Sequence, residues 1–367
     1  MSAQNPGAFP LFDLLARQWR LPAQPVAAVY DAASSTLAAP LVDGRVALIS
    51  VDDAEPAESR IVVDEAGRRT IAPRRREPRP AIVAPARGEG PACVAAAAGG
   101  GYVVARGDGG VSQLAADGAE TPLGASRGVL ALDASAQGLL AIVGARGVEL
   151  RDATGATKTG GLDWCAETVA VSPDGARLAF GCGATLRVAD RAAPLNAKTY
   201  SCAERVQRIV WRADGAYLVA ICGAGGLALL DVASGRFGVV VGFPTPPRSA
   251  AFCEAANALI AAGAFRIAAW DLAAPPFEGE RAGALETGRP GLAPVVEVAA
   301  LPRRKLAAAA YANGRIVIAA LGARDELVLQ AAGPEPAALV AAPDGRSLAV
   351  AAGGGVWLLS LPDALFK

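Results

Sequence analysis

The sequence predicts an all-β fold that is built from a repeated unit of short strands joined by tight turns. Its 367 residues are 53% hydrophobic but only 5% aromatic, and they include 42 glycines. Small side chains with frequent glycines suit many short strands and sharp connections. In addition, a pattern of three apolar segments, separated by Asp-Gly and Gly-rich turns, recurs along the chain. These observations together predict repeats of antiparallel strands.

The repeated unit is clearest in the middle and at the end of the chain. One copy spans Glu167 to Asp190, the next spans Gln207 to Asp231, and the last spans Pro336 to Asp363. In each copy an alternating apolar strand leads into a polar turn with Asp-Gly. A second apolar strand and a Gly-rich turn follow, and a third strand leads to an aspartate. Alternation with a period of two is the pattern of a β-strand.

The apolar residue that opens the second strand of each unit serves as a marker for counting. Successive markers are 37 to 47 residues apart, except for a first interval of 66 residues, and a four-stranded propeller blade takes about 40 to 45 residues. We therefore predict a single closed β-propeller of four-stranded antiparallel blades over residues 1–367. Eight blades are counted, and seven is the alternative if the first unit pairs differently. The markers are Leu37, Val103, Leu140, Leu178, Leu218, Leu259, Leu306 and Leu348.

An insertion rich in proline and arginine explains the long first interval. It covers residues 64–90 and interrupts the first unit. Strand-like apolar character is expected to stop after Val63, because Pro and Arg replace the apolar residues from there on.

The repeats resemble those of the WD40 family from Pro25 to Asp363, which is nearly the whole chain. The Ser-Pro-Asp-Gly turn of that family appears as Ser172 to Gly175, and its terminal Trp-Asp pair appears once, as Trp270-Asp271. The family's Gly-His pair is absent, because the chain contains no histidine. The resemblance implies that the last blade borrows a strand from the other end of the chain. Leu14 to Leu21, within the N-terminal segment 1–24, is expected to supply it.

The resemblance also implies a non-catalytic scaffold that binds one or more protein partners. The absence of histidine removes the commonest general base, the Ser-His-Asp triad and every zinc site that needs imidazole. A propeller enzyme that holds a metal by carboxylates in its central channel is the alternative. The first strands of the units offer only Asp133 and Glu297 as obvious acids for such a site. We therefore expect that the protein is not an enzyme.

Four cysteines occupy matching positions in two adjacent units. Cys165 and Cys202 each begin a Cys-Ala-Glu triplet, and Cys182 and Cys222 each end a second strand. In a WD40-like blade these positions lie on one face of the ring, so the four thiols are expected to converge. A cluster of four thiolates would hold about one structural zinc ion per chain, which would make the protein a metal-binding accessory protein. The simpler alternative is that these cysteines fill gaps in an alanine-rich core and that no cofactor is bound.

Two basic segments are candidate binding sites for a partner. Their arginines suit an acidic partner or a phosphate, whereas the alternative is a flexible, solvated surface. No aromatic residues for base stacking are interleaved with them, and 35 basic side chains balance 35 acidic ones. Binding to nucleic acid or to a membrane surface is therefore not expected. The residues are Arg74, Arg75, Arg76 and Arg79 in the insertion, and Arg303, Arg304 and Lys305 in a second loop.

The N-terminal residues lack the basic start, apolar run and cleavage site of a secretory signal, so a cytoplasmic location is expected. No apolar stretch reaches the roughly 20 residues that a membrane helix needs. The abundance of Ala, Gly and Arg is typical of a GC-rich bacterial genome. The sequence leaves the oligomeric state open.

Overall fold

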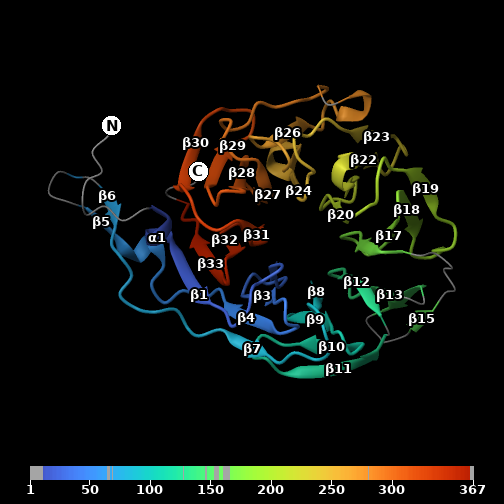
Figure 1. The fold of residues 1–367 in the computed structure, drawn as a ribbon, viewed down its shortest axis with the longest axis horizontal. Coiled ribbons are helices and arrows are strands. Elements are labelled where there is room, and N and C mark those ends of the chain that lie inside the picture. The colour runs from blue at the N-terminus through green and yellow to red at the C-terminus, as the bar shows by residue number, and fades with distance from the viewer. Residues whose placement is uncertain are drawn as a thin grey trace.

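The chain folds into a ring of β-sheets around a central axis (Figure 1). The computed structural model describes residues 11–63, 67, 69–126, 128–144, 147–152, 157–159, 166–279 and 281–363. Eight sheets stand in the ring like the blades of a propeller. This arrangement confirms the predicted β-propeller and the predicted count of eight blades. Within the described residues, no helix is long and apolar enough to cross a membrane.

The first four blades follow one another in chain order, with the first strand of each lying nearest the axis (Figure 1). The first blade contains β2 (Val29–Tyr30), β3 (Thr36–Pro40), β4 (Val46–Ser50) and β7 (Ile82–Ala84), and the second contains β8 (Cys93–Ala96), β9 (Tyr102–Ala105), β10 (Gly110–Leu114) and β11 (Glu120–Ala125). The third contains β12 (Val129–Ala134), β13 (Leu140–Gly144), β14 (Gly147–Arg151) and β15 (Thr157–Thr159), and the fourth contains β16 (Thr168–Val171), β17 (Arg177–Cys182), β18 (Thr185–Asp190) and β19 (Lys198–Ser201).

The remaining four blades complete the ring. The fifth contains β20 (Arg208–Trp211), β21 (Tyr217–Ile221), β22 (Leu227–Asp231) and β23 (Phe237–Val240), and the sixth contains β24 (Ala250–Cys253), β25 (Ala258–Ala261) and β26 (Ala268–Asp271). The seventh contains β27 (Val295–Leu301), β28 (Leu306–Tyr311), β29 (Ile316–Ala320) and β30 (Glu326–Gln330), and the eighth contains β31 (Pro336–Ala341), β32 (Ser347–Ala352), β33 (Gly355–Ser360) and β1 (Ala16–Arg20).

The hydrophobic core lies in layers between neighbouring blades, because alternate residues of a strand face opposite sides of its sheet. In β17, Leu178 and Phe180 pack toward the third blade, whereas Ala179 packs toward the fifth. Alanine dominates several layers, and residues 307–310 of β28 are four consecutive buried alanines. Such small side chains let sheets approach closely near the axis while still removing apolar surface from water.

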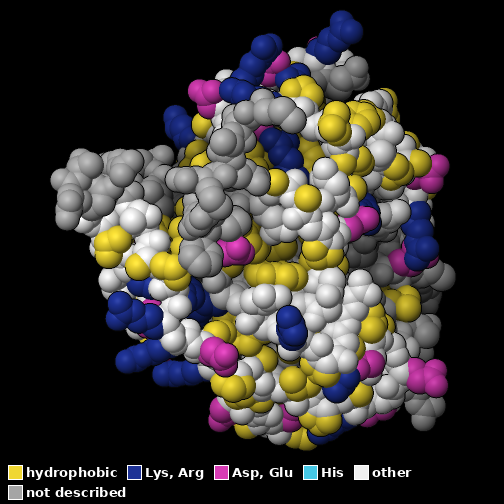
Figure 2. Space-filling view, turned by 60° about the vertical axis from the view of Figure 1, so that its left-hand side comes forward, with side chains coloured by type: hydrophobic (Ala, Val, Ile, Leu, Met, Phe, Trp, Pro, Cys, Tyr) yellow, Lys and Arg dark blue, Asp and Glu magenta, His cyan; other side chains and the backbone are white. Residues whose placement is uncertain are grey.

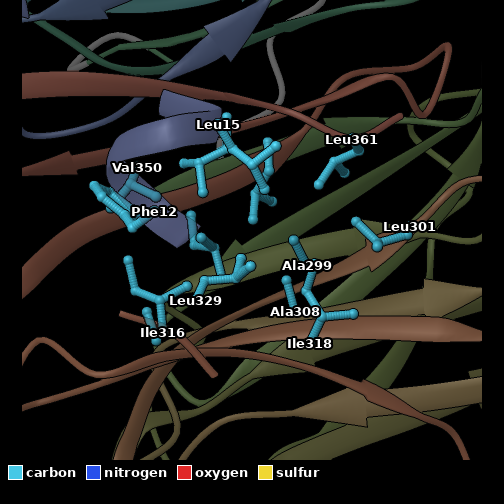
Figure 3. Close-up of a cluster of buried hydrophobic side chains, with 14 of the residues drawn as sticks. Phe12, Leu15, Ala299, Leu301, Ala308, Ile316, Ile318, Leu329, Val350 and Leu361 are labelled. Atoms are coloured by element: carbon cyan, nitrogen blue, oxygen red, sulfur yellow. The ribbon is translucent and has the colours of Figure 1, made fainter. Parts of the chain in front are cut away.

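The ring is closed by the N-terminal strand β1, which lies within the Leu14–Leu21 segment. It pairs antiparallel with β33, from Ala16 opposite Leu359 to Arg20 opposite Gly355. Just before it, the short helix α1 (Leu11–Leu15) inserts Phe12 and Leu15 into the layer between the seventh and eighth blades (Figure 3). Closure of this kind removes the exposed edge that an open sheet would present to other chains.

The insertion contains more strand structure than the sequence predicted. A hairpin of β5 (Ile61–Val63) and β6 (Arg69–Ile71) projects beside α1, and β7 then returns to pair with β4 as the outer strand of the first blade (Figure 1). The expectation that strand character ends after Val63 is therefore wrong. The outer strand is short and half-exposed, so its apolar pattern is too weak to identify from the sequence.

The sixth blade departs from the predicted four strands. Along the outer edge of β26, the described residues form two isolated bridges in place of a fourth strand, Ile267 with Thr287 and Trp270 with Ala284. The segment before Ala284 is rich in proline and glycine, which interrupt a regular ladder because proline lacks an N–H donor and glycine weakens strands. An apolar cavity of about 220 Å³ lies beside this irregular edge, next to Phe243 and Trp270.

Candidate functional site

The arginine-rich insertion is held against the ring by acidic residues that follow β4. The Arg74 guanidinium donates from Nη1 to Asp53 Oδ1 at 2.7 Å and from Nη2 to Asp53 Oδ2 at 2.8 Å. Burial raises the pKa of Asp53, but the Arg74 hydrogen bonds and the nearby charge of Arg17 outweigh it, so the pKa lies below its usual range. Bidentate pairs of this kind set both position and orientation. Arg74 therefore anchors the insertion.

A second carboxylate fixes the backbone immediately after this anchor. Glu55 Oε2 accepts the backbone N–H of Arg75 at 2.9 Å and that of Arg76 at 3.1 Å. These hydrogen bonds, the one from Arg75 foremost, lower the pKa of Glu55, so its charge persists to lower pH. The side chains of Arg75 and Arg76 are exposed, and neither forms an ion pair with any residue that the structure describes.

Arg79 completes this basic surface and ties it to the closing strand. Its carbonyl oxygen accepts a hydrogen bond from the Trp19 indole Nε1 at 2.7 Å. Its exposed guanidinium lies 3.5 Å from the equally exposed Asp52, a pair that solvent weakens. We refer to Arg75, Arg76 and Arg79 as the arginine surface. In Figure 2, which brings this side of the molecule forward, Lys and Arg side chains gather at the lower left.

The second basic segment is a turn between β27 and β28. Arg303 adopts a left-handed conformation with φ of 64°. Arg304 turns inward, where its guanidinium contacts the Leu361 carbonyl oxygen at 3.3 Å and the Asp363 carboxylate. Arg303 and Lys305 remain exposed. Two of these three basic side chains are therefore available to a partner.

The central channel contains a cavity of about 690 Å³, and alanine is the commonest residue in its wall. Glu297 of β27 lines it, with only 8% of its surface exposed. Burial raises the pKa of Glu297 to about 7, although the charge of Arg208 and the Ser249 hydroxyl act in the opposite direction. At neutral pH this carboxyl is therefore partly protonated.

The other acid that the sequence placed in the channel strands, Asp133 of β12, lies elsewhere in the ring. It accepts a hydrogen bond from the Val171 N–H at 2.7 Å, and desolvation raises its pKa to about 6. Asp133 belongs to the third blade and Glu297 to the seventh, and Asp133 does not line the cavity that contains Glu297. In the described part of the chain, no three His, Cys, Asp or Glu side chains are placed to hold a metal ion together.

The cysteines of the zinc hypothesis are only partly brought together. Cys182 packs in the layer between the third and fourth blades, whereas Cys202 and Cys222 pack in the next layer, between the fourth and fifth. This separation arises because Cys182 and Cys222 occupy matching positions in successive blades, so each faces the blade that precedes its own. Cys165 lies outside the described residues, and the four-thiolate site stays a prediction.

The pairing of these acidic residues with the arginine-rich insertion was not predicted from the sequence. Asp52, Asp53 and Glu55 form an acidic run about 20 residues before the arginine run. Two runs of opposite charge, one on each side of a hairpin, are the signal that would have indicated their pairing.

Comparisons with known proteins agree with this fold. The ring of blades, with the last blade completed by the N-terminal strand β1, defines a closed β-propeller. A chain in a crystal structure of the mitotic checkpoint complex is similar over 74% of this chain and 90% of its own length, with a TM-score of 0.55 and 16% sequence identity. At that identity the likeness concerns the fold alone. No protein-family model and no curated protein matches the sequence.

Proposed function

We propose that this protein is a non-catalytic scaffold that binds a protein partner through an acidic segment of that partner, at the arginine surface. The observation that carries the proposal is that Glu55 holds the backbone of Arg75 and Arg76 in place while both guanidinium groups stay exposed and unpaired within the described structure. WD40-like propellers are typically interaction scaffolds, which supports the same function by analogy of fold.

The charge arrangement favours an acidic partner. The whole chain has no net charge, so an attraction at this surface is local rather than global. A guanidinium group can donate two parallel hydrogen bonds to a carboxylate, and it is only weakly hydrated. Because the backbone is already fixed before binding, less conformational entropy is lost when a partner binds. The arginine surface therefore combines exposed charge with a preorganised main chain.

Exposed apolar residues that follow the arginine surface in the chain supply a second kind of contact. Ile82 is 44% exposed and Val83 is 38% exposed on β7, which follows Arg79 in the chain. β7 is also the outer strand of its blade. Interfaces commonly combine an apolar centre with charged residues at the rim. A partner segment that alternates acidic and apolar residues would meet both features.

The test is capture of partners from a lysate of the organism that encodes the chain, with the purified protein as bait. Reversing two charges, Arg75→Glu with Arg76→Glu, is expected to reduce captured partner at least about tenfold, because attraction becomes repulsion. Capture by the unchanged protein is expected to fall as salt is raised. Quantitative mass spectrometry of the captured proteins measures both effects.

The matched control reverses two charges on the other exposed basic turn, Arg303→Glu with Lys305→Glu. This variant is expected to capture the same partners as the unchanged protein. The proposal is overturned if the Arg75 and Arg76 variant captures its partners undiminished. A loss confined to the control variant would place the interface at the Arg303–Lys305 turn instead.

A further inference from the structure

Two cysteines meet in the layer between the fourth and fifth blades. Cys202 follows β19 directly, and Cys222 follows β21 directly. Both side chains belong to the same hydrophobic layer, which includes Leu186 and Val206. Neither is part of a disulfide in the structure. Residues from two neighbouring blades thus place two free thiols in one small region of the core.

The main chain around the two cysteines is tightly packed. A Cβ atom added to Gly225 would lie 2.7 Å from Glu204 Cβ, and one added to Gly223 would lie 2.6 Å from Gln207 Nε2. The Gln207 N–H also donates to the Ile221 carbonyl oxygen at 2.8 Å. The turn that follows Cys222 is therefore pressed against the segment that follows Cys202. This packing holds the two thiols in a fixed relation.

The two thiols lie in the same layer and influence each other's ionisation, and they are not equivalent. Cys202 is half-buried, and the neighbouring Cys222 thiol lowers its pKa. Cys222 is only 1% exposed, its Sγ lies 3.7 Å from the Ala220 carbonyl oxygen, and the neighbouring Cys202 thiol raises its pKa. A thiolate is the reactive form of cysteine. Cys202 is therefore the accessible nucleophile, and Cys222 is the buried thiol beside it.

Two other cysteines differ from this pair. Cys93 and Cys253 have a pKa raised chiefly by burial. Their sulfur atoms face main-chain oxygens, Cys93 Sγ lying 3.7 Å from the Leu130 carbonyl and Cys253 Sγ lying 3.3 Å from the Arg304 carbonyl. They serve as internal controls.

We propose that Cys202 and Cys222 form a reversible disulfide when the protein meets hydrogen peroxide, which makes the pair a redox-sensitive site. In the first step the Cys202 thiolate sulfur attacks one peroxide oxygen, the O–O bond breaks, and hydroxide leaves and takes up a proton as water. Cys202 becomes a sulfenic acid through this two-electron oxidation. In the second step the Cys222 sulfur attacks the Cys202 sulfur, the S–O bond breaks, and the Cys222 proton leaves with the oxygen as a second water.

The disulfide would join the outer end of the fourth blade to the fifth blade. It closes a loop between residues 202 and 222, and such a cross-link restricts the unfolded chain. A low-molecular-weight thiol would reverse the reaction by exchange. In a reducing compartment, disulfides of this kind are transient and sense oxidation. The oxidised protein is therefore expected to be more stable than the reduced protein.

The experiment treats the purified full-length protein with hydrogen peroxide and maps it with trypsin. The two cysteines fall in separate peptides, Thr199–Arg205 and Ala213–Arg236. The expected product is these two peptides joined, with a mass lower by two hydrogens than their sum, and released by a thiol reductant. The melting temperature of the oxidised protein is expected to rise by at least about 2 °C. No joined product, or either cysteine joined to a different one, overturns the proposal.

Variants test the order of the two steps. With Cys222→Ser, the Cys202 sulfenic acid is expected to persist and to be labelled by dimedone. With Cys202→Ser, Cys222 is expected to stay reduced, at least about tenfold slower to oxidise than in the unchanged protein. Cys253→Ser is the matched control and should leave the cross-link and the stability shift intact. Rapid oxidation of Cys222 in the absence of Cys202 would contradict the assigned roles.

Discussion

Replacing Glu297 with Gln is expected to stabilise the protein by about 3 kcal/mol at pH 8. The carboxyl is 8% exposed in the channel wall, and burial raises its pKa from 4.5 to about 7. Above pH 7 the folded protein must carry a buried charge that water solvates better in the unfolded chain. Gln has nearly the same shape without the charge, so the variant avoids this cost.

The sign of the pH dependence follows from the raised pKa. Below about pH 4.5 the Glu297 carboxyl is mostly protonated in both the folded and the unfolded protein, so it does not lower the free energy of unfolding. As the pH rises toward 7, the unfolded chain loses its proton first, so the stability of the unchanged protein falls through this window and then levels off. The difference in unfolding free energy between E297Q and the unchanged protein should therefore grow from near zero at pH 4.5 to its full value above pH 7.

Urea denaturation at several pH values measures this difference. Glu254→Gln is the matched control, because Glu254 also lines the channel cavity but is exposed to water. The control is expected to change the free energy of unfolding by less than about 0.5 kcal/mol across the range. A difference for E297Q that stays constant from pH 4.5 to pH 8 would show that the carboxyl does not titrate in the expected window.

Truncating Trp19 to Ala is expected to lower the free energy of unfolding by about 3 to 5 kcal/mol. Trp19 is 5% exposed on the closing strand β1 and packs in the layer between the eighth and first blades. The substitution leaves a cavity in that layer and removes the hydrogen bond from the indole to the Arg79 carbonyl oxygen. Because β1 connects the N-terminal part of the chain to the last blade, the substitution weakens the contact that closes the ring.

Gln18→Ala is the matched control for this prediction, because Gln18 is exposed on the same strand. Its expected effect on the free energy of unfolding is within about 0.5 kcal/mol, since main-chain pairing with β33 is unaffected. Urea titrations of both variants give the comparison. Equal losses for the two variants, or no loss for Trp19→Ala, would mean that β1 does not contribute to stability through its buried face.

The blade count could be predicted because each blade is a local unit. Its strands follow one another through short turns, so the apolar spacing and the Asp-Gly turns repeat along the chain. Leu178 and Leu218, two of the counting markers, are fully buried at matching positions in β17 and β21. A residue that must fill the same place in every layer leaves a periodic signal in the sequence.

The outer strands could not be predicted in the same way. β7 lies near the end of a proline- and arginine-rich insertion, and the sixth blade has no regular fourth strand among the described residues. Outer strands are partly exposed, so burial imposes little pattern on them. Whether they form depends on the neighbouring strand that offers its hydrogen bonds, which for β7 is β4, more than 30 residues earlier.

Local patterning thus specified the repeated antiparallel unit, its number and the residues that carry charge or thiol chemistry. Tertiary structure decided which of those residues meet. Glu55 and Asp53 reach the arginine run across a hairpin, so Arg74 is anchored while Arg75 and Arg76 stay exposed. Strand alternation and the stacking of blades place Cys202 against Cys222 and leave Cys182 in the preceding layer. The physical reason is that strand formation depends on near neighbours in the chain, whereas pairing of side chains between blades depends on how the whole ring closes.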